Sequence, residues 1–128
     1  MKEFEELLEV VTKLFSPEGC PWDKEQTLQS MKKYILEEAQ EVVEAIDEND
    51  RDHLLEEIGD LAIHLISLSL MAKKDGFFSL ADVFLCAKEK LIRRHPHVFS
   101  GLKVNSVQEV LVNWEKIKKA EKEATKFL

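Results

Sequence analysis

The stretches Glu37-Glu38-Ala39-Gln40-Glu41 and Glu56-Glu57-Ile58-Gly59-Asp60 repeat one pattern of acidic and apolar residues, nineteen positions apart. Placed on helical wheels at about 100° per residue, each copy has an apolar stripe on one face and the second acid of its Glu-Glu pair at the edge of that stripe. We therefore predict two matching amphipathic helices. The stripe consists of Ile35, Leu36, Ala39, Val42, Val43 and Ile46 in the first copy and Leu54, Leu55, Ile58, Leu61, Ala62 and Leu65 in the second.

A short polar segment, Asp47-Glu48-Asn49-Asp50, separates the two copies and predicts a turn. Two matching helices joined by such a turn pack antiparallel. Glu38 then lies level with Asp60, because both are equally far from the centre of the turn. Glu41 lies level with Glu57 for the same reason. We expect four carboxylates to converge beside a hydrophobic seam.

Negative charges that converge in a partly dry place repel one another unless something neutralises them. A hard divalent cation would do so, and ligation by oxygen alone suits Mg²⁺, with Mn²⁺ as a substitute, rather than zinc. The alternative is that the acids simply face water, as most acids on helix surfaces do. The matching wheel angles of the two copies favour the metal site.

Composition predicts one soluble all-α domain over residues 1–128. Apolar residues make up 45% of the chain and charged residues 34%, while 4 Gly and 3 Pro leave little material for turns. No alternation typical of strands competes with the helical periodicity, so we expect a helical bundle built round the antiparallel hairpin. The net charge of −7 argues against binding to a nucleic-acid polymer or an anionic membrane.

Two observations favour a cytoplasmic location. Cys20 and Cys86 have no metal-ligand spacing and form no disulfide framework, which is typical of free thiols in a reducing compartment. The segment Met1–Glu6 lacks the apolar run of a signal peptide, and the apolar stretch Leu61–Ala72 is too short to span a bilayer.

Caps and breakers predict five helices. They run from about Lys2 to Phe15, from an N-cap at Asp23 to about Glu48, from about Asp52 to Lys74, from Ser79 to Arg94, and from Ser106 to a frayed end near Phe127. Residues 95–105 are expected to form a loop, since Pro96 disfavours helix at the residue before it.

Basic residues gather in the last third of the chain. Lys90 and Arg94 belong to a group at the end of the fourth predicted helix, and Lys118 follows Trp114 by one helical turn. Such residues are often no more than solvated helix surface, and a lone Trp most often packs in a core. Beside a metal site they would suit a nucleotide, because Arg and Lys bind phosphate and an indole can cover a base.

Four motifs carry a resemblance to a known family, and they are spread over most of the chain. They are Gly19-Cys20-Pro21-Trp22-Asp23-Lys24-Glu25-Gln26-Thr27, Tyr34-Ile35-Leu36-Glu37-Glu38-Ala39-Gln40-Glu41, Glu56-Glu57-Ile58-Gly59-Asp60-Leu61 and Glu89-Lys90-Leu91-Ile92-Arg93-Arg94-His95-Pro96-His97-Val98-Phe99. Their order and spacing resemble the MazG family of nucleoside triphosphate pyrophosphohydrolases, within the all-α NTP pyrophosphatase superfamily.

The resemblance implies an enzyme that hydrolyses an NTP or dNTP to the monophosphate and pyrophosphate. It implies a magnesium site in the helix hairpin and assembly as a homodimer or homotetramer. The metal ligands would be Glu38, Glu41, Glu57 and Asp60, and the substrate-binding residues Lys90, Arg94, Trp114, Lys118 and Trp22. Within this hypothesis Glu38 and Glu41 are also the catalytic residues, because one of them would draw a proton from the attacking water.

Two other classes of protein are alternatives to the hydrolase. A di-iron bundle needs Glu-x-x-His pairs on two helices, and neither Glu41 nor Glu56 has a His three residues later. A non-catalytic helical oligomer or regulatory adaptor with a degenerate nucleotide site stays open as the alternative.

Overall fold

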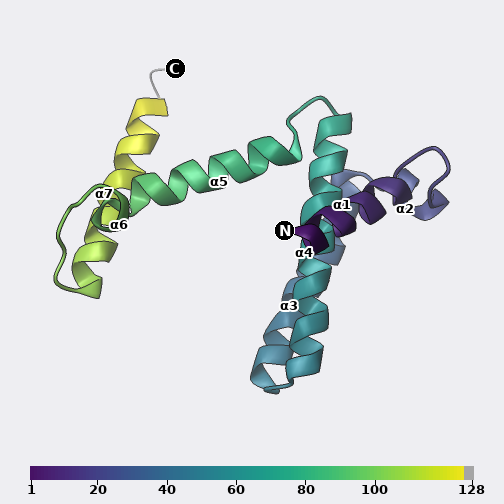
Figure 1. The fold of residues 1–128 in the computed structure, drawn as a ribbon, viewed down its shortest axis with the longest axis horizontal. Coiled ribbons are helices and arrows are strands. Elements are labelled where there is room, and N and C mark those ends of the chain that lie inside the picture. Colours follow the sequence, from purple (N-terminus) through teal and green to yellow (C-terminus); the bar gives the residue numbers. More distant parts are fainter. Residues whose placement is uncertain (126–128) are drawn as a thin grey trace. The chain divides into compact units, whose positions relative to one another are not determined.

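The computed structural model describes residues 1–125, and every regular element in that range is a helix (Figure 1). The predicted all-α class is confirmed. The chain forms two compact units, the first covering Met1–Leu80 and the second beginning at Ala81. The prediction of a single domain over residues 1–128 stays a prediction.

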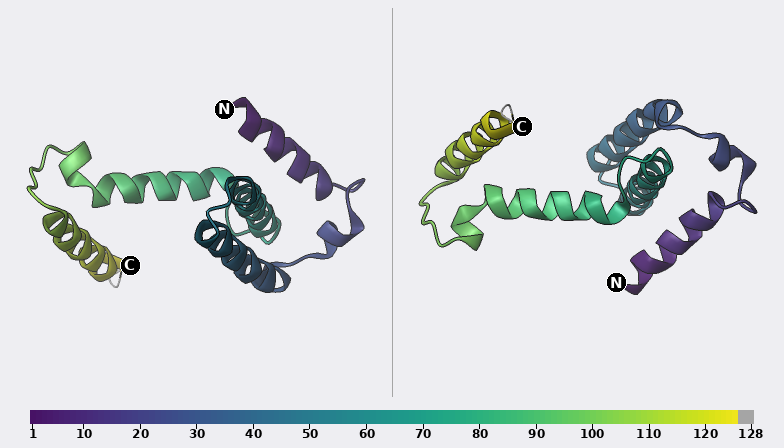
Figure 2. Two further views of the ribbon diagram at one scale, coloured as in Figure 1. Left: turned by 90° about the horizontal axis from the view of Figure 1, so that it is seen from below. Right: turned by 90° about the horizontal axis from the view of Figure 1, so that it is seen from above.

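The first unit contains the predicted hairpin. It consists of α1 (Lys2–Leu14), α2 (Pro21–Glu25), α3 (Leu28–Asp47) and α4 (Arg51–Lys74). In all views α3 and α4 run antiparallel and side by side (Figures 1 and 2). Helix α1 packs against α4.

The predicted start of α3 at Asp23 is wrong. Pro21 begins the separate short helix α2, and Asp23 lies inside it. Helix α3 begins after Thr27, whose Oγ1 accepts a hydrogen bond from the Ser30 backbone N–H at 3.1 Å. The Ser30 hydroxyl accepts one in return from the Thr27 N–H at 2.9 Å. This reciprocal capping box takes the place of the N-cap expected at Asp23.

The turn between α3 and α4 is as short and polar as predicted. Asn49 adopts a left-handed conformation with a φ of 54°, which Asn tolerates better than most residues. Asp50 caps α4, because its Oδ1 accepts a hydrogen bond from the His53 N–H at 3.1 Å. At the other end, α4 stops at Lys74 as predicted, and Gly76 just beyond it has a φ of 79°, a left-handed conformation that glycine adopts readily.

The seam between α3 and α4 differs from the prediction. Glu38 and Glu57 are buried in the hairpin, whereas the middle of each predicted apolar stripe faces outward. The physical reason is rotation about the helix axes: α3 presents the edge of its stripe, with the small Ala45 and Glu38, to the hairpin. The exposed apolar stripe, as we call it, consists of Leu36, Val43, Ile46, Leu55, Ile58 and Leu65.

The second unit contains α5 (Leu80–Arg94), α6 (Pro96–Phe99) and α7 (Val107–Thr125). The expected loop over residues 95–105 therefore includes one short helix, because Pro96 is well suited to a first helical position. Ser106 caps α7 as predicted, accepting a hydrogen bond from the Glu109 N–H at 3.2 Å. The expected helix end near Phe127 lies outside the described residues. Within residues 1–125, no helix has the length and apolar character needed to cross a membrane.

Candidate metal centre and substrate-binding residues

The hairpin brings the four predicted carboxylates together. Glu38 and Glu41 come from successive turns of α3, and Glu57 and Asp60 from successive turns of α4. One oxygen from each lies within 4.8 Å of one oxygen from every other. Two i, i+3 pairs on antiparallel neighbouring helices produce this arrangement, since residues three apart share a helix face. We call these four residues the carboxylate cluster.

Burial is uneven across the carboxylate cluster. Glu38 is 6% exposed and Glu57 5% exposed, whereas Asp60 is partly exposed and Glu41 is exposed. Both buried carboxylates carry an oxygen without a hydrogen-bond donor, Oε1 of Glu38 and Oε2 of Glu57. A buried acceptor that no donor satisfies is rare in folded proteins and calls for an explanation.

Mutual proximity disturbs the acidity of three of these groups. Burial, reinforced by the charges of Asp60 and Glu41, raises the pKa of Glu38 above its usual value. Proton sharing with Glu38, together with burial, raises the pKa of Glu57. Proton sharing with Glu57 and the Glu57 charge raise the pKa of Glu41. When all four are ionised, none can donate a hydrogen bond to another, and the two buried oxygens then have no donor among their neighbours.

The donor set fits a hard divalent cation. Four carboxylates supply only oxygen, which Mg²⁺ and Mn²⁺ prefer. A cation would neutralise the repulsion that raises these pKa values and would occupy the buried oxygens that lack donors. The acids adjacent in sequence, Glu37 and Glu56, are exposed and lie outside the carboxylate cluster.

The sequence of the chain matches the profile of the MazG nucleotide pyrophosphohydrolase domain over residues 26–99. The chain belongs to the MazG family. A crystal structure of a mazG-related protein from Thermotoga maritima superposes with a TM-score of 0.77 at 30% identity, covering 90% of this chain and 98% of that one. The matched segment includes the whole carboxylate cluster.

Curated relatives of this MazG chain are longer proteins. A nucleoside triphosphate pyrophosphohydrolase/pyrophosphatase MazG from Thermotoga maritima is 45% identical over 93% of this chain and 45% of its own length. A nucleoside triphosphate pyrophosphohydrolase from Escherichia coli is 42% identical over 95% of this chain and 47% of its own length. An uncharacterized protein from Bacillus subtilis is 48% identical over 94% of this chain and 24% of its own length. The chain thus spans half or less of these relatives.

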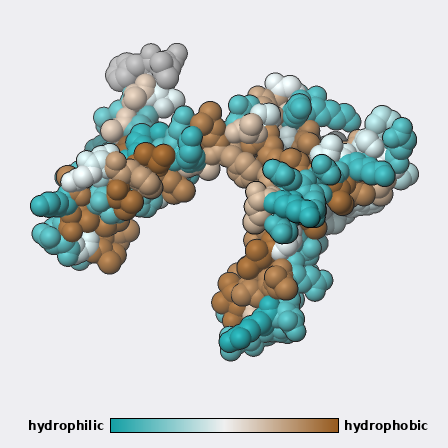
Figure 3. Space-filling model, viewed as in Figure 1, coloured by the Kyte–Doolittle hydropathy of each residue, from teal (hydrophilic) through white to brown (hydrophobic). Residues whose placement is uncertain are grey.

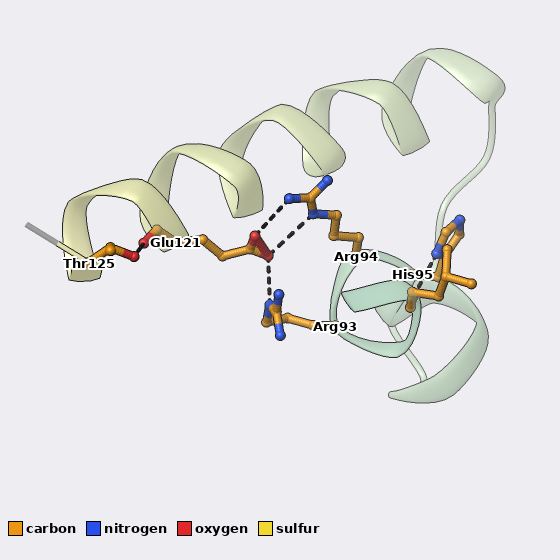
Figure 4. A network of polar contacts seen from close by, with 6 residues as sticks. Arg93, Arg94, His95, Glu121 and Thr125 are labelled. Atoms are coloured by element: carbon orange, nitrogen blue, oxygen red, sulfur yellow. Dashed lines mark hydrogen bonds and ion pairs between the residues drawn. The ribbon is translucent and has the colours of Figure 1, made fainter. Parts of the chain in front are cut away.

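In the second unit of this MazG chain, Arg94 is engaged by other residues (Figure 4). Its Nη2 donates to Glu121 Oε2 at 2.9 Å and its Nε to Glu121 Oε1 at 3.3 Å. Arg93 Nε also donates to Glu121 Oε1, at 2.6 Å. The two guanidinium groups lower the pKa of Glu121 to about 2. The Arg94 guanidinium also lies 5.2 Å from the centre of the Trp114 ring, in a cation–π contact.

The other predicted substrate-binding residues differ in their surroundings. Lys118 is half-buried and, with Arg94, Glu121, Lys122 and Thr125, lines a cavity of about 590 Å³. Lys90 is exposed on α5. Trp22, in the first unit, is 49% exposed and packs edge-on against Tyr34 with ring centres 5.6 Å apart.

A second cavity lies in the first unit and does not belong to the carboxylate cluster. It measures about 460 Å³ and is lined by apolar residues such as Phe15 and Met71 and by polar ones such as Lys24 and Lys74. None of the four clustered carboxylates lines it.

Sequence reasoning missed two residues that contact candidate site residues. His53 Nε2 lies 3.4 Å from Glu57 Oε1, and the spacing of four residues on one helix was a readable signal. Burial lowers the pKa of His53, but Glu48 and Glu57 outweigh it and leave a net rise. No sequence signal marked Glu121, because its partners lie on another helix.

Proposed function

We propose that this protein is a nucleoside triphosphate pyrophosphohydrolase. It hydrolyses an NTP or dNTP to the nucleoside monophosphate and pyrophosphate and depends on Mg²⁺, which Mn²⁺ can replace. The observation that carries this proposal is the carboxylate cluster, with its two buried oxygens that lack donors. The names of the Thermotoga maritima and Escherichia coli relatives support the same class of reaction.

The four carboxylates of the cluster, Glu38, Glu41, Glu57 and Asp60, would hold the metal. When bound, Mg²⁺ neutralises triphosphate charge and lowers the pKa of a coordinated water. The protein's own contribution is a pair of antiparallel helices that fixes the carboxylates before the ion arrives, which limits the ordering needed on binding.

Glu38 and Glu41 are the proposed catalytic residues, and their exposure separates their roles. Glu41 is exposed at the open side of the carboxylate cluster, so its carboxylate accepts the proton of the attacking water. The water oxygen bonds to the α-phosphorus while the bond from that phosphorus to the bridging oxygen breaks. The bridging oxygen and its electron pair leave with pyrophosphate. Glu38 is buried and holds the metal side of the site.

Lys90, Arg94, Trp114, Lys118 and Trp22 are the proposed substrate-binding residues. Lys118 and Arg94 have the chemistry for phosphate oxygens, and both line the cavity of the second unit. Glu121 holds Arg94 in a defined orientation, which reduces the side-chain entropy that Arg94 loses on binding an anion. Trp22 exposes half its surface and could cover a base.

The protein is proposed to act as a homodimer or homotetramer in the cytoplasm. The exposed apolar stripe supports self-association, since Leu36 is 72% exposed and Leu55 75% exposed on adjacent helices. Figure 3 shows apolar surface gathered on the hairpin beside the α3–α4 turn. Exposed apolar patches of this kind mark surfaces that another protein covers.

A pyrophosphate-release assay tests the function. Purified protein is incubated with each common NTP and dNTP, with and without Mg²⁺. We expect release that requires the metal, and a loss of at least about 100-fold in Asp60→Ala and Glu41→Gln, because removing even outer contacts of a metal site costs 10–100-fold. Glu37→Gln is the matched control, since Glu37 is exposed and outside the carboxylate cluster.

Normal turnover in both cluster variants would overturn the assignment. Titration calorimetry with Mg²⁺ and a non-hydrolysable nucleotide then distinguishes the alternative. An enzyme binds the nucleotide in a metal-dependent manner, whereas a non-catalytic adaptor shows no such dependence.

A further inference from the structure

His53 lies between two carboxylates at the start of α4. Its backbone N–H is fixed by the Asp50 cap at 3.1 Å. Its ring Nε2 lies 3.4 Å from Glu57 Oε1, and its Nδ1 lies 3.5 Å from Glu48 Oε2. The ring therefore connects the buried carboxylate of Glu57 to the exposed acid of the α3–α4 turn.

The two oxygens of Glu57 have different surroundings. Oε1 faces the His53 ring, whereas Oε2 is buried without a hydrogen-bond donor. A carboxylate held by one oxygen has a restricted rotation, and its other oxygen keeps a constant direction. The contact with Glu57 uses an N–H at Nε2, and the contact with Glu48 uses an N–H at Nδ1, because an ionised carboxylate can only accept.

We propose that His53 is a positioning residue of the carboxylate cluster, which holds Glu57 through Oε1 and leaves Oε2 to the metal. Glu48 acts through His53, because it fixes the ring from the other side. The inference rests on the proposed function in that it assumes a cation at the carboxylate cluster. It assigns no direct contact of His53 with metal or substrate.

Metal affinity in the absence of nucleotide tests the proposal. Free Mn²⁺ is measured by electron paramagnetic resonance while the protein is titrated with Mn²⁺ alone. We expect His53→Ala to weaken Mn²⁺ binding by about 10-fold or more, the usual effect of removing a group that orients a metal ligand. His53→Gln should recover most of the affinity, because its amide N–H can still reach the residue four positions on.

Two further variants separate positioning from a general effect on the helix. Glu56→Gln changes an exposed acid on α4 outside the carboxylate cluster and should bind Mn²⁺ like the wild type. Glu48→Gln should weaken binding by less than His53→Ala. Combined with His53→Ala it should add nothing, since Glu48 acts only through the ring.

Mn²⁺ affinity of His53→Ala within twofold of the wild type overturns the proposal. Should His53→Ala fail to fold by circular dichroism, Glu48→Gln and His53→Gln decide: wild-type affinity in the first together with a tenfold loss in the second contradicts the arrangement. The pyrophosphate assay tests the proposed function separately from the role of His53. A wild type that binds Mn²⁺ in a His53-dependent way but releases no pyrophosphate refutes the function alone, and one that binds no Mn²⁺ refutes both.

Discussion

Glu38 is an acid that the fold buries between two helices, against the usual preference of carboxylates for water. Burial and the negative charges of Asp60 and Glu41 disfavour the ionised form of Glu38 and raise its pKa. A folded-state pKa above the ordinary value of 4.5 means that the folded protein binds more protons than the unfolded one just above that pH. Stability of the metal-free protein therefore falls as the pH rises through this range.

Glu38→Gln should accordingly stabilise the metal-free protein at pH 7. We expect a rise in Tm of a few degrees, since about 1 kcal/mol shifts the Tm of a domain of this size by roughly 3–6 °C. The gain should vanish below the ordinary pKa of 4.5, where the wild-type carboxyl is protonated. Scanning calorimetry in the presence of a chelator measures both effects.

Mg²⁺ provides the control for this prediction. The wild type should gain stability when Mg²⁺ is added, whereas Glu38→Gln should gain much less, because it has lost a ligand. A variant that is less stable than the wild type without metal would contradict the repulsion inferred at the carboxylate cluster.

At the residue scale, the sequence allowed the four carboxylates to be predicted but not their burial. Spacing on a helix determines which residues share a face, so Glu41 and Asp60 could be placed beside their partners. The helical wheel does not determine which part of that face a neighbouring helix covers. Burial of Glu38 depended on that rotation, and so did the exposure of Leu36.

At the scale of elements, caps decide where helices begin. The pair Thr27 and Ser30 satisfies two backbone groups at the start of α3, the helix that carries Glu38 and Glu41. Asp23 was predicted as the N-cap because Asp is among the residues preferred there. Asp23 instead lies inside α2, because Pro21, with its φ fixed near the helical value, begins a separate helix two residues earlier.

Thr27→Ala should destabilise the first unit by about 1 kcal/mol, the usual effect of removing an N-cap side chain. Thr27→Ser keeps the hydroxyl and should stay close to the wild type. Urea unfolding followed by circular dichroism compares the two. Equal urea midpoints for the alanine and serine variants would show that the capping box contributes nothing to the stability of the first unit.

Glu121 on α7 pairs with two arginines at the end of α5. Glu121 accepts hydrogen bonds from both Arg93 and Arg94 (Figure 4), and its pKa is lowered to about 2. A lowered pKa in the folded state contributes stability that is present above the ordinary value of 4.5. It is lost as the pH falls from there toward 2.

Glu121→Gln should therefore lower the stability of the second unit at pH 7, and its difference from the wild type should shrink as the pH falls below 4.5. Urea unfolding at several pH values, followed by Trp114 fluorescence in a Trp22→Phe background, measures the difference. Glu123→Gln, at an exposed position on the same helix, is the control. A difference that persists unchanged to pH 2.5 would contradict the ion pairs as its source.

At the scale of the whole molecule, the all-α class and the hairpin could be predicted because few glycines and prolines interrupt a clear helical period. Contacts between segments that are distant in the sequence could not be predicted. Arg94 was predicted to bind phosphate, and nothing in its local pattern indicated that Glu121 lies against it. The exposed apolar stripe was likewise assigned to the core, because a pattern of apolar residues does not distinguish the chain's own core from a surface covered by a second copy.

Self-association through the exposed apolar stripe is the last prediction. The wild type should have the mass of a dimer or tetramer in size-exclusion chromatography with light scattering. Leu55→Lys should shift it toward monomer, because truncating or charging a central apolar contact typically costs about 2 kcal/mol or more, roughly a 30-fold loss of affinity. Leu55 is 75% exposed in the single chain, so lysine there should leave the monomer's fold intact, with a change of about 0.5 kcal/mol at most. Leu111→Lys is the matched control, since Leu111 is 59% exposed on α7, outside the stripe, and should keep the wild-type mass. A wild type that stays monomeric at high concentration would contradict this prediction. The exposed apolar stripe would then be covered by a different protein or face water.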